Sequence, residues 1–289
     1  TVTTSPSAYA GADAEICETS VSYLIADATA AEYASLMWTT AGDGSFDDAS
    51  LLNPTYTPGL NDLSNGSVVL TLTAYGNGSC ADAVDAMTLT VTTAPSAYAG
   101  MDAEICETAG SYMIPDAMAD NYASLAWITS GDGSFDDPSI LAPTYTPGSG
   151  DIASGSVVLT LTAAGNGSCA DAVDAMTLTV TTAPSAYAGA DAEICETGVY
   201  QILDALAADY SSIMWTTSGS GSFNDPTAID PVYTPSQNDI DDGFVILSLT
   251  AYGNGSCTDA VDNMTLSITA QATAYAGADA SICETANSY

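Results

Sequence analysis

Stretches of alternating apolar and polar residues recur along the whole chain. Residues 87–91 read Met-Thr-Leu-Thr-Val, and residues 67–74 and 36–40 are further short runs rich in apolar residues and threonine. Alternation with a period of two predicts half-buried β-strands whose threonines face water. Asn65-Gly66 and residues 76–78 supply turn signals between these runs. With the shorter extended pieces, the pattern predicts about seven strands in each stretch of about 90 residues.

Helical and membrane-spanning segments are not indicated by this pattern. Residues 27–34, Asp-Ala-Thr-Ala-Ala-Glu-Tyr-Ala, have a helix-friendly composition. The segment is too short to be stable as an isolated helix, so we expect a loop with a single turn. No apolar run approaches the roughly 18 residues that a membrane-spanning helix needs.

The whole pattern repeats at an almost constant interval. The motif at residues 8–19, Ala-Tyr-Ala-Gly-Ala-Asp-Ala-Glu-Ile-Cys-Glu-Thr, returns with few changes at residues 97–108, 186–197 and 274–285. Its cysteine recurs after 89, 89 and 88 residues. A unit of this size can bury a core of its own. We therefore predict three repeats, at residues 1–93, 94–182 and 183–270, and the start of a truncated fourth repeat at residues 271–289.

Each full repeat combines features of a Greek-key β-sandwich. It has about seven short strands, frequent turns, a tryptophan on a middle strand and a pair of flanking cysteines. The expected fold is thus all-β, with tandem immunoglobulin-like repeats. The joints are short and two contain Pro95 or Pro184, which restrict the backbone. They favour a stiff rod, with a loosely jointed string as the alternative.

The cysteines form one pair per full repeat, 62 or 63 residues apart. Such position-locked pairs are typical of structural disulfides in an oxidising compartment, which predicts an extracellular protein. A metal site would need two more soft ligands nearby, and the chain has no histidine. Cys283 is expected to have its partner outside the chain. The predicted pairs are Cys17 with Cys80, Cys106 with Cys169, and Cys195 with Cys257.

All charged side chains of the protein are acidic. The chain has 36 Asp and Glu residues and no Lys, Arg or His. Phosphate neutralisation and attraction to anionic lipid both need basic side chains, so we expect no nucleic-acid partner and no membrane insertion. The repulsion must be relieved by screening, by spacing along a rod or by bound cations. Calcium is the natural cation, and an acidic surface that only maintains solubility is the alternative.

Most catalytic chemistry is excluded by residue type. Histidine-based triads, lysine Schiff bases and arginine clamps are absent because their residues are absent. A glycosidase with two carboxylates is possible by residue type alone. Every candidate pair, however, recurs in successive repeats, as scaffold residues do, so we expect no enzyme.

Acidic loops are the best candidates for a metal site. Oxygen ligands at close spacing suit calcium, a hard cation. In the third repeat the matching positions hold Ser220 and Asn224, so turn chemistry is the alternative. A second acidic set, Asp82 and Asp85 with their copies, is open to the same two interpretations. The candidate calcium ligands are Asp43, Asp47, Asp48, Asp132, Asp136 and Asp137.

The repeat also resembles a known group of domains. Residues 38–46, Trp-Thr-Thr-Ala-Gly-Asp-Gly-Ser-Phe, together with Ala-Gly-Ala-Asp at 10–13 and Ile-Cys-Glu at 16–18, resemble PKD-like and related immunoglobulin-like repeats of giant Bacteroidota surface proteins. The resemblance covers every repeat. It implies large secreted adhesins, including gliding-motility and biofilm filaments exported by the type IX system.

These observations favour a structural function. We expect a non-catalytic stalk or filament-forming region of a large extracellular bacterial surface protein. Its expected partners are neighbouring repeats and copies of itself in a filament, with a surface ligand bound elsewhere. Two alternatives stay open, namely an array of ligand- or glycan-binding modules and a spacer region of a secreted enzyme.

Overall fold

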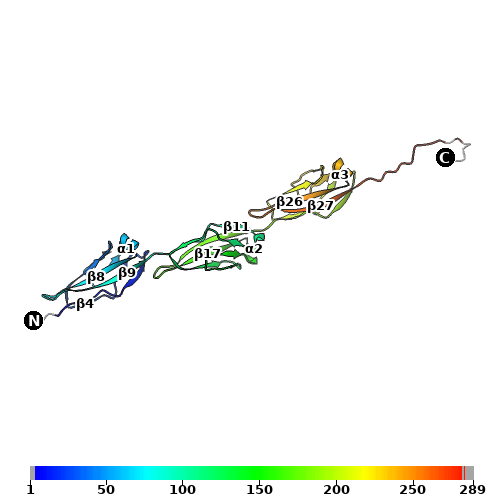
Figure 1. Ribbon diagram of the computed structural model, residues 1–289. Coiled ribbons are helices and arrows are strands. Elements are labelled where there is room, and N and C mark those ends of the chain that lie inside the picture. Colours follow the sequence, from blue (N-terminus) through cyan, green and yellow to red (C-terminus); the bar gives the residue numbers. More distant parts are fainter. Residues whose placement is uncertain (1–3, 282, 284–289) are drawn as a thin grey trace. The chain divides into compact units, whose positions relative to one another are not determined.

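The computed structural model describes residues 4–281 and residue 283, and short β-strands dominate it (Figure 1). The described residues form two compact units. One contains the residues up to 103 together with 109–180, and the other contains 104–108 together with the residues from 181 onward. The names first, second and third repeat are kept below for residues 1–93, 94–182 and 183–270.

A four-stranded sheet forms the larger layer of the first repeat. Its order is β2-β9-β8-β5, where the strands are β2 (Ala14–Cys17), β9 (Ala83–Thr92), β8 (Ser67–Gly76) and β5 (Tyr33–Thr40). Strand β2 runs parallel to β9, and the other neighbours are antiparallel. The parallel register places Cys17 beside Thr92, at the end of β9.

A smaller sheet and a two-stranded ribbon complete the first repeat. The sheet has the order β3-β7-β6 and the ribbon pairs β1 with β4. Trp38 of β5 packs on Phe46, and Phe46 packs on Tyr56, with ring centroids 5.8 and 4.9 Å apart. These rings join the two layers. The strands are β1 (Ser7–Tyr9), β3 (Tyr23–Leu24), β4 (Thr29–Ala31), β6 (Ser45–Phe46) and β7 (Thr55–Thr57).

The core follows the alternation in the sequence. On β8 the side chains of Val68, Leu70 and Leu72 are buried, and on β9 those of Met87 and Leu89 are buried. Intervening threonines such as Thr71 and Thr88 are only partly covered, because successive residues of a strand point to opposite faces of the sheet. Binary patterning therefore accounts for which face of the main sheet is inside.

The second repeat has the same order of strands along the chain, with a 3-10 turn added after β11. In its main sheet β14, β17 and β18 are neighbours in this order and antiparallel. Its smaller sheet has the order β12-β16-β15, and β10 pairs with β13. The elements are β10 (Ser96–Tyr98), β11 (Ala103–Cys106), the 3-10 turn η1 (Glu107–Ala109), β12 (Tyr112–Met113), β13 (Met118–Asp120), β14 (Tyr122–Thr129), β15 (Ser134–Phe135), β16 (Thr144–Thr146), β17 (Ser156–Gly165) and β18 (Ala172–Thr181).

The third repeat again contains a main sheet, ordered β20-β27-β26-β23, a smaller sheet β21-β25-β24 and a ribbon β19-β22. Strand β20 is parallel to β27. The strands are β19 (Ser185–Tyr187), β20 (Ala192–Cys195), β21 (Tyr200–Gln201), β22 (Leu206–Ala208), β23 (Ser212–Thr217), β24 (Ser222–Phe223), β25 (Val232–Thr234), β26 (Phe244–Tyr252) and β27 (Ala260–Thr269).

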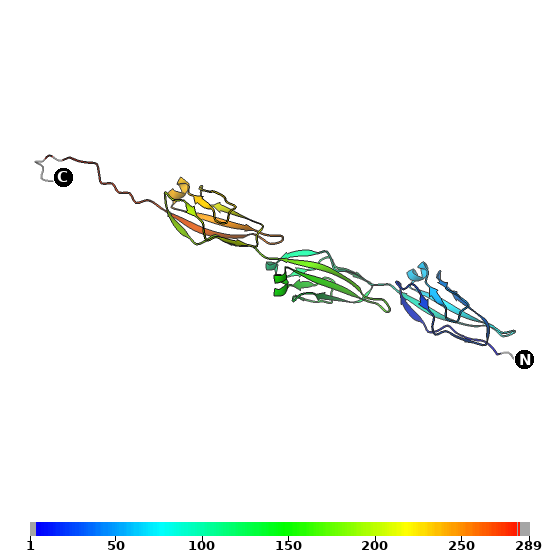
Figure 2. The same ribbon diagram turned by 180° about the vertical axis from the view of Figure 1, so that it is seen from behind.

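Two local expectations were wrong. Residues 27–34, expected as a loop, contain β4 and the start of β5, because β1 supplies a partner strand for residues 29–31. Glu32 between them adopts a positive φ of 57°. A short helix before β8 was also missed, and it lies beside that strand in both views (Figures 1 and 2). The helices are α1 (Leu60–Asn65), α2 (Ser149–Ser154) and α3 (Gln237–Asp242).

No helix in the described part of the chain is long and apolar enough to cross a membrane.

Candidate functional site

Disulfides connect successive repeats. Cys17 is bonded to Cys169 and Cys106 is bonded to Cys257, with Cα atoms 4.8 Å apart in both cases and sequence separations of 152 and 151 residues. Each bond joins the first cysteine of one repeat to the second cysteine of the following repeat. The predicted disulfides within each repeat were therefore wrong in their pairing: Cys17 does not pair with Cys80, Cys106 does not pair with Cys169, and Cys195 does not pair with Cys257.

The geometry of β9 explains why the expected pairing fails. Cys17 lies beside Thr92 at the end of β9, whereas Cys80 precedes the start of that strand at Ala83. Ten residues of β9 at about 3.3 Å each separate these positions by roughly 30 Å. Bonded cysteines need Cα atoms within about 7 Å of each other. The two cysteines of one repeat thus lie at opposite ends of its main sheet.

A glycine-rich hairpin tip carries the second cysteine of each repeat. We call residues 76–80, 165–169 and 253–257, each with the sequence Gly-Asn-Gly-Ser-Cys, the hairpin tips. In the second tip the amide of Asn166 donates to the carbonyl of Asn121, 2.7 Å away, and Asn121 has a positive φ of 54°. The asparagines of the other tips make the same bond to Glu32 and Asp209. The tip asparagine therefore supports the turn.

The Glu15 carboxylate receives the hairpin tip of the second repeat. Its Oε1 accepts from the Thr92 hydroxyl at 2.6 Å and from the Ser168 backbone N–H at 3.1 Å. Gly167, with a φ of +54°, lies against the same carboxylate, and a Cβ at this position would overlap it. The hydrogen bond from Thr92 and, secondarily, that from Ser168 lower the pKa of Glu15. A glycine followed by a backbone donor thus fits the carboxylate.

The second unit contains the same set of contacts. Glu104 Oε1 accepts from the Thr181 hydroxyl at 2.8 Å and from the Ser256 N–H at 3.0 Å, and Gly255 has no room for a Cβ. The hydrogen bond from Thr181 and then that from Ser256 lower the pKa of Glu104. Since this arrangement occurs twice with equivalent residues, it is a property of the motif.

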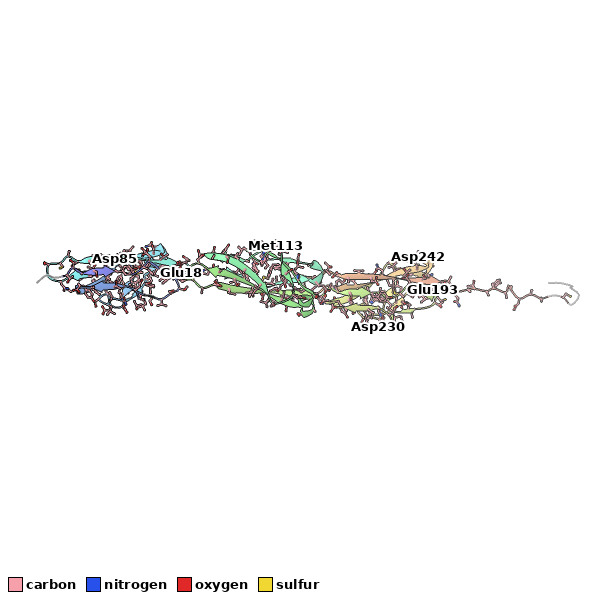
Figure 3. The ribbon with its side chains drawn as sticks, turned by 90° about the horizontal axis from the view of Figure 1, so that it is seen from below. Glu18, Asp85, Met113, Glu193, Asp230 and Asp242 are labelled. Atoms are coloured by element: carbon pink, nitrogen blue, oxygen red, sulfur yellow. A yellow bond between two sulfur atoms is a disulfide. The ribbon has the colours of Figure 1, made fainter. Side chains whose placement is uncertain are left out.

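The matching end of the third repeat holds the same residues, and within the described part of the chain no hairpin tip lies against them. Cys17 and Cys106 are 4% and 6% exposed, whereas Cys195 is an exposed free thiol. Glu18 and Glu193 each lie where the main sheet of their own repeat ends (Figure 3). The prediction that Cys283 has its partner outside the chain is not tested.

The residues of the acidic loops bond to backbone groups. Asp43 Oδ1 accepts from the N–H groups of Asn61 and Asp62, at the start of α1. Asp47 Oδ1 accepts from the N–H groups of Asp48 and Thr55, both at 2.8 Å. In the third repeat Asn224 makes the two equivalent bonds at 2.9 and 2.8 Å. A neutral amide oxygen therefore serves as well as the charged carboxylate in this turn.

The remaining loop acids follow the same rule. Asp48 accepts from the N–H and the hydroxyl of Ser50, and these bonds lower its pKa. Asp132, Asp136 and Asp137 make the corresponding bonds in the second repeat, which lower the pKa of each. Among the described residues, no three His, Cys, Asp or Glu side chains gather in an arrangement that could hold a metal ion. Calcium binding at these loops stays a prediction.

Two coupled substitutions explain why the third acidic loop differs. In the first repeat Asp43 bonds to the first turn of α1, and its carboxylate occupies the space that a Cβ at Gly59 would need. In the third repeat Ser220 replaces that aspartate and Ser236 replaces that glycine. The Ser236 hydroxyl accepts from the Asp239 N–H, so the cap is supplied locally. The two substitutions occur together in the sequence, and together they indicate that these positions cap the helix.

A buried carboxylate lies behind each acidic loop, and sequence reasoning missed it. Asp62 is 1% exposed, and its Oδ2 accepts from the Tyr56 hydroxyl at 2.7 Å and from the N–H groups of Gly44 and Gly59. Burial raises the pKa of Tyr56 to about 12, and Asp62 adds to the rise. Two backbone N–H groups and a phenol therefore satisfy this buried carboxyl oxygen. Asp151 and Asp239 occupy the same position in the other repeats.

The second acidic set is also structural. Asp82 accepts from the N–H of Gly76 and closes the hairpin, and Asp85 accepts from the N–H of Ala10 and holds the chain after β1 to the main sheet. Equivalent bonds are made by Asp171, Asp174, Asp259 and Asp262. In a chain without basic side chains, backbone N–H groups are the main partners of the carboxylates.

Comparisons with known proteins give relatives in fold only. No protein-family model and no curated protein sequence matches the chain. Among solved structures, a fragment of titin I-band domains I67–I69 has a TM-score of 0.53 at 9% identity and covers 94% of this chain and 100% of that one. A variant of the same three titin domains has a TM-score of 0.53 at 11% identity, with 92% and 99% covered. Mouse cadherin-23 domains EC22–24 have a TM-score of 0.38 at 12% identity, and the match covers 92% of this chain and 99% of that one.

The titin fragments bear on the fold. The variant is a structure of three immunoglobulin domains, and both titin fragments are matched over nearly their full length. The predicted all-β fold of tandem immunoglobulin-like sandwiches is therefore confirmed. At these identities the likeness concerns architecture alone.

Proposed function

We propose that this chain is a non-catalytic, load-bearing stalk region of a large extracellular bacterial surface protein, of the kind that its resemblance to Bacteroidota adhesin repeats implies. The observation that carries the proposal is the pairing of the cysteines. Disulfides between repeats suit an oxidising compartment. A module that acts on its own would have no need of a covalent bond to its neighbour.

The two disulfides overlap along the chain. Cys106 lies inside the loop closed by Cys17 and Cys169, and Cys169 lies inside the loop closed by Cys106 and Cys257. Tension applied beyond Cys17 and Cys257 passes through both bonds. The shortest covalent path from Cys17 to Cys257 crosses the first disulfide to Cys169, follows the chain back over 63 residues to Cys106 and crosses the second disulfide. Along the sequence, Cys17 and Cys257 are 240 residues apart. The cross-links therefore limit how far the chain extends even after its domains unfold.

The chemistry of the chain supports the same role. Glu15 and Glu104 bind the hairpin tips through backbone N–H groups, which a purely acidic protein has in abundance. Load is then shared by a disulfide and by hydrogen bonds at the same place. The absence of Lys and Arg also removes every trypsin cleavage site.

Single-molecule force spectroscopy tests the proposal, with handles at the two ends of the chain. The reduced chain should extend by about 600 Å more than the oxidised chain, because 177 more residues enter the path at roughly 3.4 Å each. Before the pulling experiment, the disulfide pairing is checked by cleavage with a protease specific for acidic residues and by mass spectrometry without reduction. A peptide with Cys17 linked to Cys169 is expected. Equal extension before and after reduction would refute a load-bearing role.

A further inference from the structure

The end of the third repeat has the backbone geometry of a hairpin-tip site. Strand β20 is parallel to β27 and Cys195 lies beside Thr269, as Cys17 lies beside Thr92 in the first repeat. The N–H of Glu196 donates to the carbonyl of Thr269 at 2.9 Å, and Glu18 makes the same bond to Thr92 at 2.9 Å. The strand pairing that presents the cysteine therefore exists without a docked tip.

The side chains at this end differ from those of the two occupied sites. The Thr269 hydroxyl donates to the carbonyl of Ile194 at 3.2 Å, whereas Thr92 donates to Glu15. Within the described residues, Glu193 makes neither of the two hydrogen bonds that Glu15 makes. The Cys195 thiol is exposed and free. A glutamate and an exposed thiol thus lie at one sheet end, beside a threonine whose hydroxyl bonds to the Ile194 carbonyl in place of the glutamate.

We infer that this end of the third repeat is a docking site for the hairpin tip of one further repeat of this type, with the sequence Gly-Asn-Gly-Ser-Cys. The tip's serine N–H donates to the Glu193 carboxylate, and its cysteine forms a disulfide with Cys195. The same residue types at the same positions hold this tip at Glu15 with Cys17 and at Glu104 with Cys106. The inference concerns the site itself and does not depend on the stalk role.

The site selects its occupant by size and by charge. Glycine is favoured at the third position of the tip, because Gly167 and Gly255 have positive φ angles of 54° and 51° and a Cβ there would displace the receiving carboxylate. The tip has no charged side chain, so it approaches Glu193 and Glu196 without repulsion between carboxylates. An acidic loop of this chain would be repelled at the same place.

Formation of the bond is a two-electron oxidation. The Cys195 thiol and the tip thiol lose two protons and two electrons and form one S–S bond. A small-molecule disulfide such as oxidised glutathione accepts them and leaves as two thiols. Exchange proceeds through a mixed disulfide, which the exposure of Cys195 permits.

The test is a four-repeat variant in which residues 271–289 are replaced by a second copy of residues 183–271. It is reduced, reoxidised with oxidised and reduced glutathione, and mapped by mass spectrometry without reduction. We expect Cys195 to be linked to the copy of Cys257, alongside the two native disulfides. A Gly255→Ala change in the copy should slow formation of this bond, because alanine is strained at this positive φ and displaces the glutamate carboxylate. Glu193→Gln should slow bond formation about 2- to 10-fold, the value of one hydrogen bond.

Two results would overturn the inference. One is a Cys195 thiol that still reacts with a thiol reagent after reoxidation, and the other is a bond between the two cysteines of the copy. A second variant carrying a copy of residues 94–182 in place of the first copy guards against misfolding of one added repeat. Amide hydrogen exchange shows whether either added repeat is folded. A free Cys195 beside a folded added repeat refutes the docking site.

Discussion

The ends of the first and third repeats carry almost the same sequence and differ in their surroundings. Both read Ala-Glu-Ile-Cys-Glu-Thr and both pair in parallel with the last strand of their repeat. At the first, Ile16 and Cys17 are 7% and 4% exposed, and at the third Cys195 is exposed. The motif therefore forms the strand by itself, and the docked hairpin tip provides the burial.

The interiors of the first and third repeats, unlike their ends, share the same buried contact. The hydroxyl of Tyr56 donates to Asp62 at 2.7 Å, and the hydroxyl of Tyr233 donates to Asp239 at 2.7 Å. The buried tyrosine–aspartate contact is thus the same in the first and third repeats. Matched substitutions in the first and third repeats should have equal effects in the interior and unequal effects at the ends.

The largest difference is expected for the cysteines. Cys17→Ser opens a loop with a sequence separation of 152 residues and should lower the free energy of unfolding by about 2–5 kcal/mol, since the loop restricts the unfolded chain. Cys195→Ser should leave it unchanged. Urea unfolding followed by tryptophan fluorescence measures both. Equal losses in the two variants would contradict the contrast between the ends.

The buried aspartates should give equal losses. Asp62→Asn and Asp239→Asn each place an amide where backbone N–H groups and a tyrosine hydroxyl now donate, so each should cost about 2–3 kcal/mol. Asp242→Asn is the control, because Asp242 is exposed at the end of α3. Chemical denaturation of the three variants provides the measurement. A marked difference between Asp62→Asn and Asp239→Asn would show that interior contacts depend on the neighbouring repeat.

Alkaline pH should weaken all three interiors alike. Burial raises the pKa of Tyr56, Tyr145 and Tyr233 from 10 to about 12. Their contribution is complete below pH 10 and is lost as pH rises from 10 towards 12. At pH 11 the loss is at most about 1.4 kcal/mol per repeat. Tyrosinate absorbance during a pH titration should show a late phase that includes these three phenols, and Tyr56→Phe should reduce its amplitude by one phenol.

Much of the fold could be predicted from the sequence. Alternation along β8 and β9 indicates which face is buried, because a strand exposes successive residues to opposite sides. Trp38, Phe46 and Tyr56 are the large rings between the layers. The sequence predicts the strand that carries Trp38, although this strand, β5, lies at the edge of the main sheet and not in its middle. Strand β4 was missed because its pairing partner lies some twenty residues earlier in the chain.

The disulfide pairing could not be predicted from spacing alone. Two cysteines that are 62 or 63 residues apart within a repeat can be bonded to each other or can lie at opposite ends of one sheet. The parallel pairing of β2 with β9 decides between them, and no pattern in four residues of β2 reveals its direction. By contrast, the joint change of Asp43 to Ser220 and of Gly59 to Ser236 was readable as a capping exchange.

Substitution of the glutamate at the sheet end should have different effects on disulfide reduction in the first and third repeats. Glu15→Gln should speed reduction of the Cys17–Cys169 bond by dithiothreitol about 2- to 10-fold, because the contact from Ser168 weakens. Glu193→Gln should leave the reduction rate of both disulfides unchanged. The pKa of Glu15 is lowered from 4.5, so its contribution is present above pH 4.5 and is lost as pH falls further. Quenched time points resolved by mass measure the rates.

The smallest effect is expected from calcium. The loop carboxylates of Asp43, Asp47 and Asp48 already accept backbone hydrogen bonds, and Asn224 replaces one of them without loss of those bonds. Calcium should therefore raise the melting temperature by less than about 1 °C over sodium at the same ionic strength. Differential scanning calorimetry with and without a chelator measures it. A larger rise that is reduced in Asp48→Asn and disappears when Asp137→Asn is added would establish calcium sites in the first two repeats, and the lack of a site in the third repeat would then follow from Ser220 and Asn224.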